Sequence, residues 1–120
     1  MSNVKEEKRI NRHTRIRKKL FGSQARPRLC VHRSLKNLRV QVVDDTTGKV
    51  LFGKSTLAKE VKSKAAYGGN IKAAEILGEA LGREAIKRGI QQIAFDRGGY
   101  PYHGRIKALV EAARKTGLQF

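Results

Sequence analysis

An eight-residue stretch of the sequence has the letters of a phosphate-binding loop. The pattern of nucleoside triphosphatases, in which backbone amides wrap around phosphates, is matched by Gly48-Lys49-Val50-Leu51-Phe52-Gly53-Lys54-Ser55. Residues 50–52, however, favour an extended strand, and residues 44–48, Asp-Asp-Thr-Thr-Gly, are typical of a hairpin turn. Asp96 follows an apolar segment and could imitate an acidic strand that holds magnesium, but 120 residues leave too few parallel strands for that fold. We therefore interpret the stretch as a hairpin strand and predict no small-molecule substrate.

The other acidic, histidine and cysteine side chains do not form a catalytic or metal-binding pattern. Asp44 and Asp45 are adjacent, so they would face opposite sides of a strand, and as turn residues they need no metal. Asp96 is expected to accept hydrogen bonds that fix its glycine-rich loop. The three histidines lie in three different segments, and the single cysteine, Cys30, can form neither an internal disulfide nor a zinc site. We predict no enzyme, no metal and no cofactor.

Two glycine-aromatic loops carry the strongest chemical signal. The first combines two glycines that allow close approach of a ligand, three rings that can stack on bases or riboses, and three cations that can bind phosphate. Its members are Gly98, Gly99, Tyr100, Tyr102, His103, Arg97, Arg105 and Lys107. The second repeats the combination at the start of a helix, with Tyr67, Gly68, Gly69 and Asn70. The alternative for the first loop is an ordinary strand-to-helix connection, in which the tyrosines pack on the scaffold and His103 caps the helix.

The elements that must position these loops follow from apolar periodicity and turn residues. We expect strands at 28–33, 38–43, 50–52 and 93–95, a helix at 70–88 that ends at Gly89, and a last helix that starts near Ile106 and ends before Gly117. The predicted fold class is α/β, with a three-strand antiparallel meander and one parallel strand beside the first, flanked by two helices. This arrangement places the loops at 66–70 and 96–104 at equivalent ends of the sheet. Gly78 and Gly82 in the first helix are expected to allow close packing on the sheet.

Positive charge is concentrated at the N-terminus. The chain has 27 Lys and Arg against 10 Asp and Glu, a net charge of +17, which indicates a polyanionic partner. Residues 1–24 are predicted to be a basic arm that is disordered or becomes helical on binding RNA, with a helix that begins at a capping box formed by Asn3 and Glu6. Residues 25–120 are predicted to form a single RNA-binding domain. The alternative for the basic run alone is a solvated face or a localisation signal. The arm residues expected to contact phosphate are Arg9, Arg12, Arg15, Arg17, Lys18 and Lys19.

Several segments resemble the family of large-subunit ribosomal protein eighteen, found in bacteria and organelles. The resemblance rests on 26–29 (Arg-Pro-Arg-Leu), 41–45 (Gln-Val-Val-Asp-Asp), 55–56 (Ser-Thr), 67–70 (Tyr-Gly-Gly-Asn), above all 95–109 (Phe-Asp-Arg-Gly-Gly-Tyr-Pro-Tyr-His-Gly-Arg-Ile-Lys-Ala-Leu), and the C-terminal 112–120. It implies an α/β sandwich and a non-catalytic function: binding 5S rRNA and attaching it, with neighbouring ribosomal proteins, to the large-subunit rRNA at the central protuberance. The implied location is the cytoplasmic ribosome, or an organellar one.

Charge and loops together predict a division of labour in RNA binding. The arm supplies affinity through phosphates, and the domain supplies selection through its loops and two strand residues, Arg28 and Arg33. The alternative function is a general nucleic-acid-binding or chaperone protein, for which charge alone would suffice. No run of apolar residues exceeds three, so we expect neither a membrane span nor a secretory signal.

Overall fold

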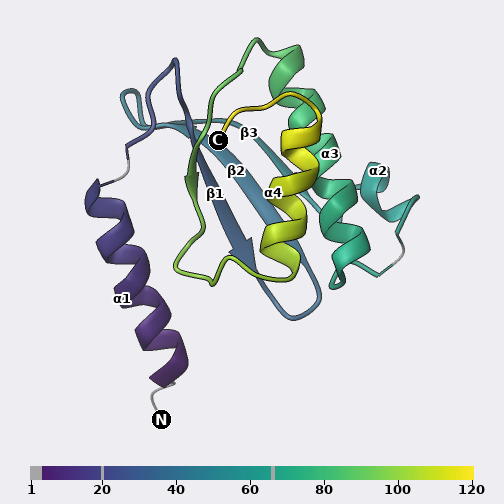
Figure 1. The fold of residues 1–120 in the computed structure, drawn as a ribbon, viewed down its shortest axis with the longest axis horizontal. Helices are drawn as coiled ribbons and strands as arrows, with labels where there is room; N and C mark the ends of the chain where they lie inside the picture. The colour runs from purple at the N-terminus through teal and green to yellow at the C-terminus, as the bar shows by residue number, and fades with distance from the viewer. Residues whose placement is uncertain (1–3, 20, 66) are drawn as a thin grey trace.

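A computed structural model describes residues 4–19, 21–65 and 67–120, with the side chains of residues 16–19 outside the description. The elements, in chain order, are α1 (Val4–Lys19), β1 (Arg28–Arg33), β2 (Leu38–Asp44), β3 (Lys49–Ser55), α2 (Lys59–Lys62), α3 (Ile71–Lys87), β4 (Ala94–Asp96) and α4 (Arg105–Lys115). Helix α1 extends beside the rest of the molecule, and α3 and α4 lie side by side over the sheet (Figure 1). The proposed cap at Asn3 lies outside the described residues. None of the described helices has the length and apolar character needed to cross a membrane.

The four strands form one mixed sheet in the order β3-β2-β1-β4. β1 pairs antiparallel with β2 and parallel with β4, and β2 pairs antiparallel with β3. The predicted fold class is therefore confirmed, including the fourth strand beside the first. The parallel pairing follows from α3, which crosses over the sheet between β3 and β4 and so returns the chain in the direction of β1.

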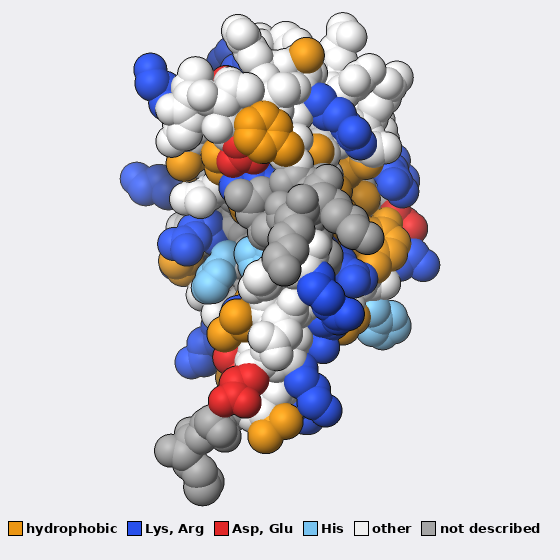
Figure 2. All heavy atoms as spheres, turned by 90° about the vertical axis from the view of Figure 1, so that its left-hand side faces the viewer, with side chains coloured by type: hydrophobic (Ala, Val, Ile, Leu, Met, Phe, Trp, Pro, Cys, Tyr) orange, Lys and Arg blue, Asp and Glu red, His pale blue; other side chains and the backbone are white. Residues whose placement is uncertain are grey.

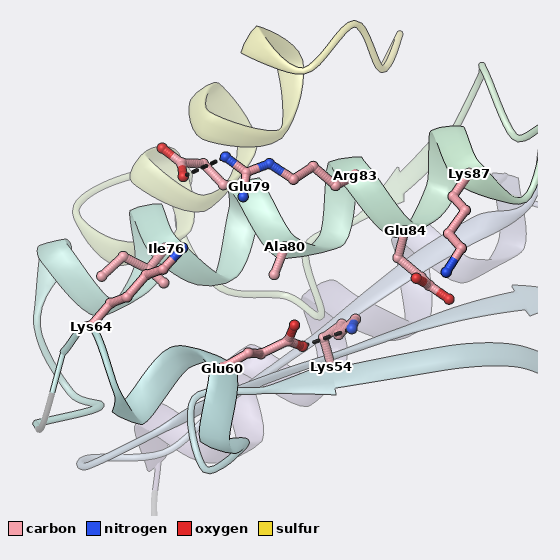
Figure 3. A pocket seen from close by; sticks show the side chains of 9 residues that line it. All are labelled: Lys54, Glu60, Lys64, Ile76, Glu79, Ala80, Arg83, Glu84 and Lys87. Atoms are coloured by element: carbon pink, nitrogen blue, oxygen red, sulfur yellow. Dashed lines mark hydrogen bonds and ion pairs between the residues drawn. The ribbon is translucent and has the colours of Figure 1, made fainter.

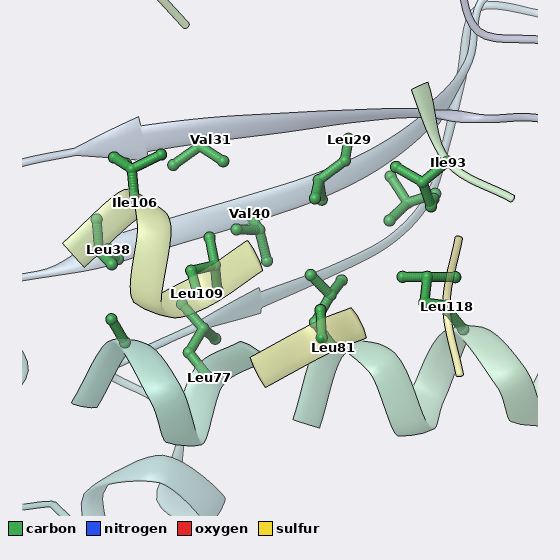
Figure 4. Close-up of a cluster of buried hydrophobic side chains, with 14 of the residues drawn as sticks. Leu29, Val31, Leu38, Val40, Leu77, Leu81, Ile93, Ile106, Leu109 and Leu118 are labelled. Atoms are coloured by element: carbon green, nitrogen blue, oxygen red, sulfur yellow. The ribbon is translucent and has the colours of Figure 1, made fainter. Parts of the chain in front are cut away.

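One face of the sheet holds the core, and the other is exposed along β2. Along β2, Leu38, Val40 and Val42 are buried, whereas Arg39 and Gln41 between them are exposed, because successive side chains point to opposite faces. The buried side chains of β1 and β2 face apolar residues of α3 and α4, with Leu77, Leu81 and Leu109 among them (Figure 4). Both helices thus cover the same face of the sheet.

The two glycines in α3 pack against a different element from the one expected. Gly78 lies against the backbone of Leu109 and the side chain of Ala112, and Gly82 lies against Thr116. A Cβ at either position would collide with these atoms of α4 and its C-terminal end. The expectation that both glycines contact the sheet was wrong, because the close approach that they allow is between α3 and α4.

Turn and cap residues act as the sequence indicates, and one short helix was missed. Asn70 caps α3 by accepting a hydrogen bond from the Ala73 amide at 2.9 Å. Asp44 accepts from the Thr46 amide at 2.9 Å, and Gly48 has a φ of 70°, so residues 44–48 form the hairpin turn. The phosphate-loop letters are therefore those of β3. Helix α2 has only four residues, too few to show helical periodicity.

Candidate nucleic-acid interface

Helix α1 is fastened to the loop that follows β4. Arg9 Nη1 donates to the Gly98 carbonyl at 2.7 Å, and Arg12 Nε donates to the Gly99 carbonyl at 3.0 Å. Gly98 and Gly99 have φ angles of 68° and 80°, and a Cβ on Gly99 would meet the backbone of Arg9 and His13. Gly99 therefore allows close approach of the protein's own helix, where the sequence suggested approach of RNA, whereas a Cβ on Gly98 would meet the Val31 carbonyl of β1.

A buried carboxylate holds this junction together. Asp96 is fully buried; its Oδ1 accepts from the Gly98 amide at 2.9 Å, and its Oδ2 lies 2.9 Å from Arg28 Nη1 and 3.0 Å from His13 Nε2. Groups from α1, β1 and the loop thus meet at one side chain. The expectation that Asp96 fixes its loop is confirmed.

Arg28 is also part of this buried network. Its Nε donates to Asp45 Oδ2 at 3.0 Å, and only 8% of the residue is exposed. Burial opposes its charge, but the hydrogen bonds from Arg28 to Asp45 and Asp96 and the charge of Asp45 outweigh it and raise the pKa of Arg28. Arg28 therefore has its partners inside the protein, which differs from the RNA contact that the sequence suggested.

Tyr100 orients two arginines. The residue is 5% exposed, and its hydroxyl donates to the Arg33 carbonyl at 3.2 Å. The guanidinium carbons of Arg9 and Arg33 lie 4.6 and 4.7 Å from its ring centroid. Arginine already occupies this ring in place of the base that the sequence suggested. Tyr100 therefore holds the guanidinium groups of Arg9 and Arg33 in position.

The second glycine loop packs on the turn between β1 and β2. A Cβ on Gly68 would meet Asn37 and Thr56, and one on Gly69 would meet the Leu35 carbonyl. The first loop reaches the same turn, because Arg105 Nη2 donates to the Ser34 carbonyl at 2.8 Å. The prediction that the two loops lie at the same end of the sheet is confirmed.

The described side chains that remain accessible at this end are rings, cations and one amide. Tyr67 and Tyr102 are 53% and 39% exposed. The other exposed members are Arg33, Asn70, His103 and Lys107, with Arg97 and Arg105 half-buried. His103 does not cap α4, since Gly104 occupies the cap position without a side-chain hydrogen bond. We call these eight residues, together with the 34–37 turn, the loop end.

A groove with cationic walls separates α1 from Pro101. It has a volume of about 290 Å³ and is lined by Lys5, Lys8, Arg9, Arg12, Arg33, Glu6, Tyr100 and Pro101. Its one carboxylate, Glu6, pairs with Arg9 at 2.6 Å. On the face that carries α1, Lys and Arg side chains border the helix (Figure 2). Lys5 and Lys8 were not among the predicted site residues, although their spacing from Arg9 and Arg12 on one helix could have indicated them.

The remaining predicted arm residues are either exposed or have side chains outside the described part of the chain. Arg15 is exposed on α1. The side chains of Arg17, Lys18 and Lys19 lie outside the described part of the chain, although the helix backbone continues to Lys19. Whether residues 1–24 are ordered before RNA binds stays a prediction.

Comparison with known proteins gives one consistent result. The family model described as "Ribosomal L18 of archaea, bacteria, mitoch. and chloroplast" matches residues 3–120. The protein named large ribosomal subunit protein uL18 of Thermotoga neapolitana is 51% identical over 116 residues, 97% of this chain and 95% of that protein. The protein of the same name from Acetivibrio thermocellus is 52% identical over 112 residues, 93% of this chain and 92% of that protein.

Proposed function

Because this chain belongs to the ribosomal L18 family and is a structural constituent of the large ribosomal subunit, we propose that it binds 5S rRNA there. In this proposal it attaches 5S rRNA to the large-subunit rRNA at the central protuberance, together with neighbouring ribosomal proteins. The relatives named above are bacterial, so we place it in the cytoplasmic ribosome. The family is not an enzyme family, and the described residues contain no cluster of His, Cys, Asp or Glu that could hold a metal ion.

The observation that carries the proposal is the composition of the loop end. Two separate loops bring Tyr67, Tyr102 and His103 to the same end of the sheet as the guanidinium of Arg33, which forms no ion pair with any described residue. Exposed rings can stack on unpaired bases, and cations can bind the phosphates between them. A surface with both features supports recognition of a folded RNA with exposed bases, beyond attraction to charge.

The docking of α1 extends this surface. Arg9 and Arg12 each donate one hydrogen bond to the 96–104 loop and also line the groove, so the helix and the loop present their cations together. We propose that the RNA backbone follows this groove and continues along α1 past Arg15. The arm then contributes affinity, and the loop end contributes selection.

A binding titration over a series of salt concentrations tests the proposal. The ligands are folded 5S rRNA, a structured RNA of the same size with an unrelated sequence, and duplex DNA, each at trace concentration. We expect all three affinities to fall with salt while the preference for 5S rRNA persists, because selection by stacking and shape does not depend on counterion release. If the three affinities fall together without a preference, the isolated chain is a general polyanion binder and the 5S assignment fails for it.

A further inference from the structure

Two arginines from different elements lie at the loop end, and neither has a carboxylate partner among the described residues. Arg33 is the last residue of β1, and Arg105 is the first residue of α4. The guanidinium of Arg33 is held against the Tyr100 ring, yet no described acceptor takes a hydrogen bond from it. Arg105 Nη2 donates to the Ser34 carbonyl at 2.8 Å, whereas its Nη1 is buried and has no hydrogen-bond partner in the described part of the chain.

The two positive charges act on each other. Burial lowers the pKa of Arg105, and the charge of Arg33 lowers it further. Other described arginines that are paired have carboxylate partners: Arg9 with Glu6, Arg28 with Asp45 and Asp96, Arg83 with Glu79, and Arg88 with Glu84. In the described part of the chain, neither Arg33 nor Arg105 forms an ion pair, so this is a place where an anion from outside the chain would relieve repulsion.

We propose that Arg33 and Arg105 together bind one phosphodiester group of the RNA backbone, with the exposed guanidinium of Arg33 in direct contact and the half-buried Arg105 as the second positive charge, an inference that rests on the proposed function. A guanidinium is a planar fork that binds phosphate oxygens through two parallel N–H bonds. Tyr100 holds the fork of Arg33 in place before RNA arrives, so little rotamer entropy is lost on binding. The start of α4 adds amide groups that favour an anion. The ring of Tyr67 is exposed at the same end and can stack on an adjoining base.

The test measures the salt dependence of 5S rRNA binding for substitutions of both arginines. Arg33→Gln is expected to flatten the slope of log affinity against log salt by about one and to weaken binding about tenfold at 0.15 M salt. Arg33→Lys is expected to restore the slope but only part of the affinity, because an ammonium lacks the fork. The matched control is Arg83→Gln on α3, which removes one charge from a side chain that is 66% exposed and 3.5 Å from Glu79. We expect it to change binding by less than about twofold.

The double substitution tests whether the two arginines share a phosphate. If they do, Arg33→Gln/Arg105→Gln flattens the slope by about one, as Arg33→Gln does alone. Flattening of the slope by about two in the double variant would overturn the shared site. Equal effects of Arg33→Gln and Arg83→Gln would overturn the site while a persisting preference for 5S rRNA still supported the proposed function. If the wild-type chain shows no preference but Arg33→Gln flattens the slope for every RNA, the phosphate site stands and the 5S assignment fails. Arg33 is exposed, so Arg33→Gln still tests whether a phosphate is bound at this place even if Arg105→Gln unfolds the chain.

Discussion

The face formed by α3, α2 and β3 and the loop end both carry many cations, but these cations have different partners. On the α3 face, lysines and arginines lie beside glutamates around a cavity of about 150 Å³ (Figure 3). The ion pairs of this region are Lys54–Glu60 at 2.7 Å, Arg83–Glu79 at 3.5 Å and Arg88–Glu84 at 2.8 Å. At the loop end, Arg33 stacks on a tyrosine and Arg105 binds a carbonyl. Net charge alone would not distinguish these two regions.

The difference indicates which cations are available to RNA. A cation paired with a carboxylate must give up that partner, or share it, before it can bind phosphate, whereas an unpaired one only releases counterions. We therefore expect substitutions at the loop end to change RNA binding and substitutions on the α3 face to leave it nearly unchanged. Stability is expected to depend most on the buried carboxylate that fixes the 96–104 loop.

The largest effect is expected from Asp96→Ala. The substitution leaves Arg28 with one carboxylate partner in place of two and removes the acceptor of the Gly98 amide, so we expect the free energy of unfolding to fall by about 3 kcal/mol. Urea denaturation at pH 7 measures it. Glu79→Ala, which breaks an exposed pair, is the control and should change stability by no more than about 0.5 kcal/mol. Equal losses in the two variants would show that the Asp96 network does not hold the junction.

Deletion of residues 1–19 tests the arm against the rest of the surface. It removes eight lysines and arginines, so we expect affinity for 5S rRNA to fall about 100-fold at 0.15 M salt and the salt slope to flatten. The ratio of affinities for 5S rRNA and an unrelated structured RNA should survive, because all residues of the loop end are retained. Limited proteolysis gives a second measurement: the free chain should be cut first before about residue 22, and bound 5S rRNA should protect it. Loss of the ratio on deletion would assign selection to the arm.

Tyr67→Ala tests stacking at the loop end. Base stacking on an aromatic ring contributes about 1–3 kcal/mol, so we expect roughly a tenfold loss of 5S affinity with an unchanged salt slope. Tyr67→Phe should retain the affinity, because the ring remains. Ile86→Ala is the control on α3, where the side chain is 41% exposed, and should leave RNA binding unchanged. A flattened slope in Tyr67→Ala would show that the residue acts through a nearby cation.

The fold was largely predictable because its signals are local, and the partners of single site residues were not. Alternation in β2, the cap at Asn70 and the turn at Gly48 are all set by neighbours in sequence. Arg28, in contrast, meets Asp96, which is 68 residues away, and a guanidinium suits a carboxylate as well as a phosphate. Tyr100 likewise presents a ring that suits arginine as well as a base. Residue type thus identified two loops that lie at the same end of the sheet but could not say which of their side chains face inward.

The smallest effect is expected on the α3 face, from Glu84→Gln. The hydrogen bond from Arg88 lowers the pKa of Glu84, burial raises it, and the charge of Arg88 lowers it again. Together these effects leave the pKa of Glu84 below its ordinary value of 4.5. A carboxylate with a lowered pKa stabilises the folded state above 4.5, and this contribution is lost as the pH falls through the folded value. The stability difference between wild type and Glu84→Gln should therefore be small at pH 7 and vanish in acid, as thermal unfolding at several pH values would show. The substitution keeps the contacts of Arg88 with the Leu51 carbonyl and the Phe52 ring, so a difference that persists at low pH would mean that Glu84 acts by packing.

Affinity for 5S rRNA should not change in this variant, and a clear change would remove the distinction between the two regions.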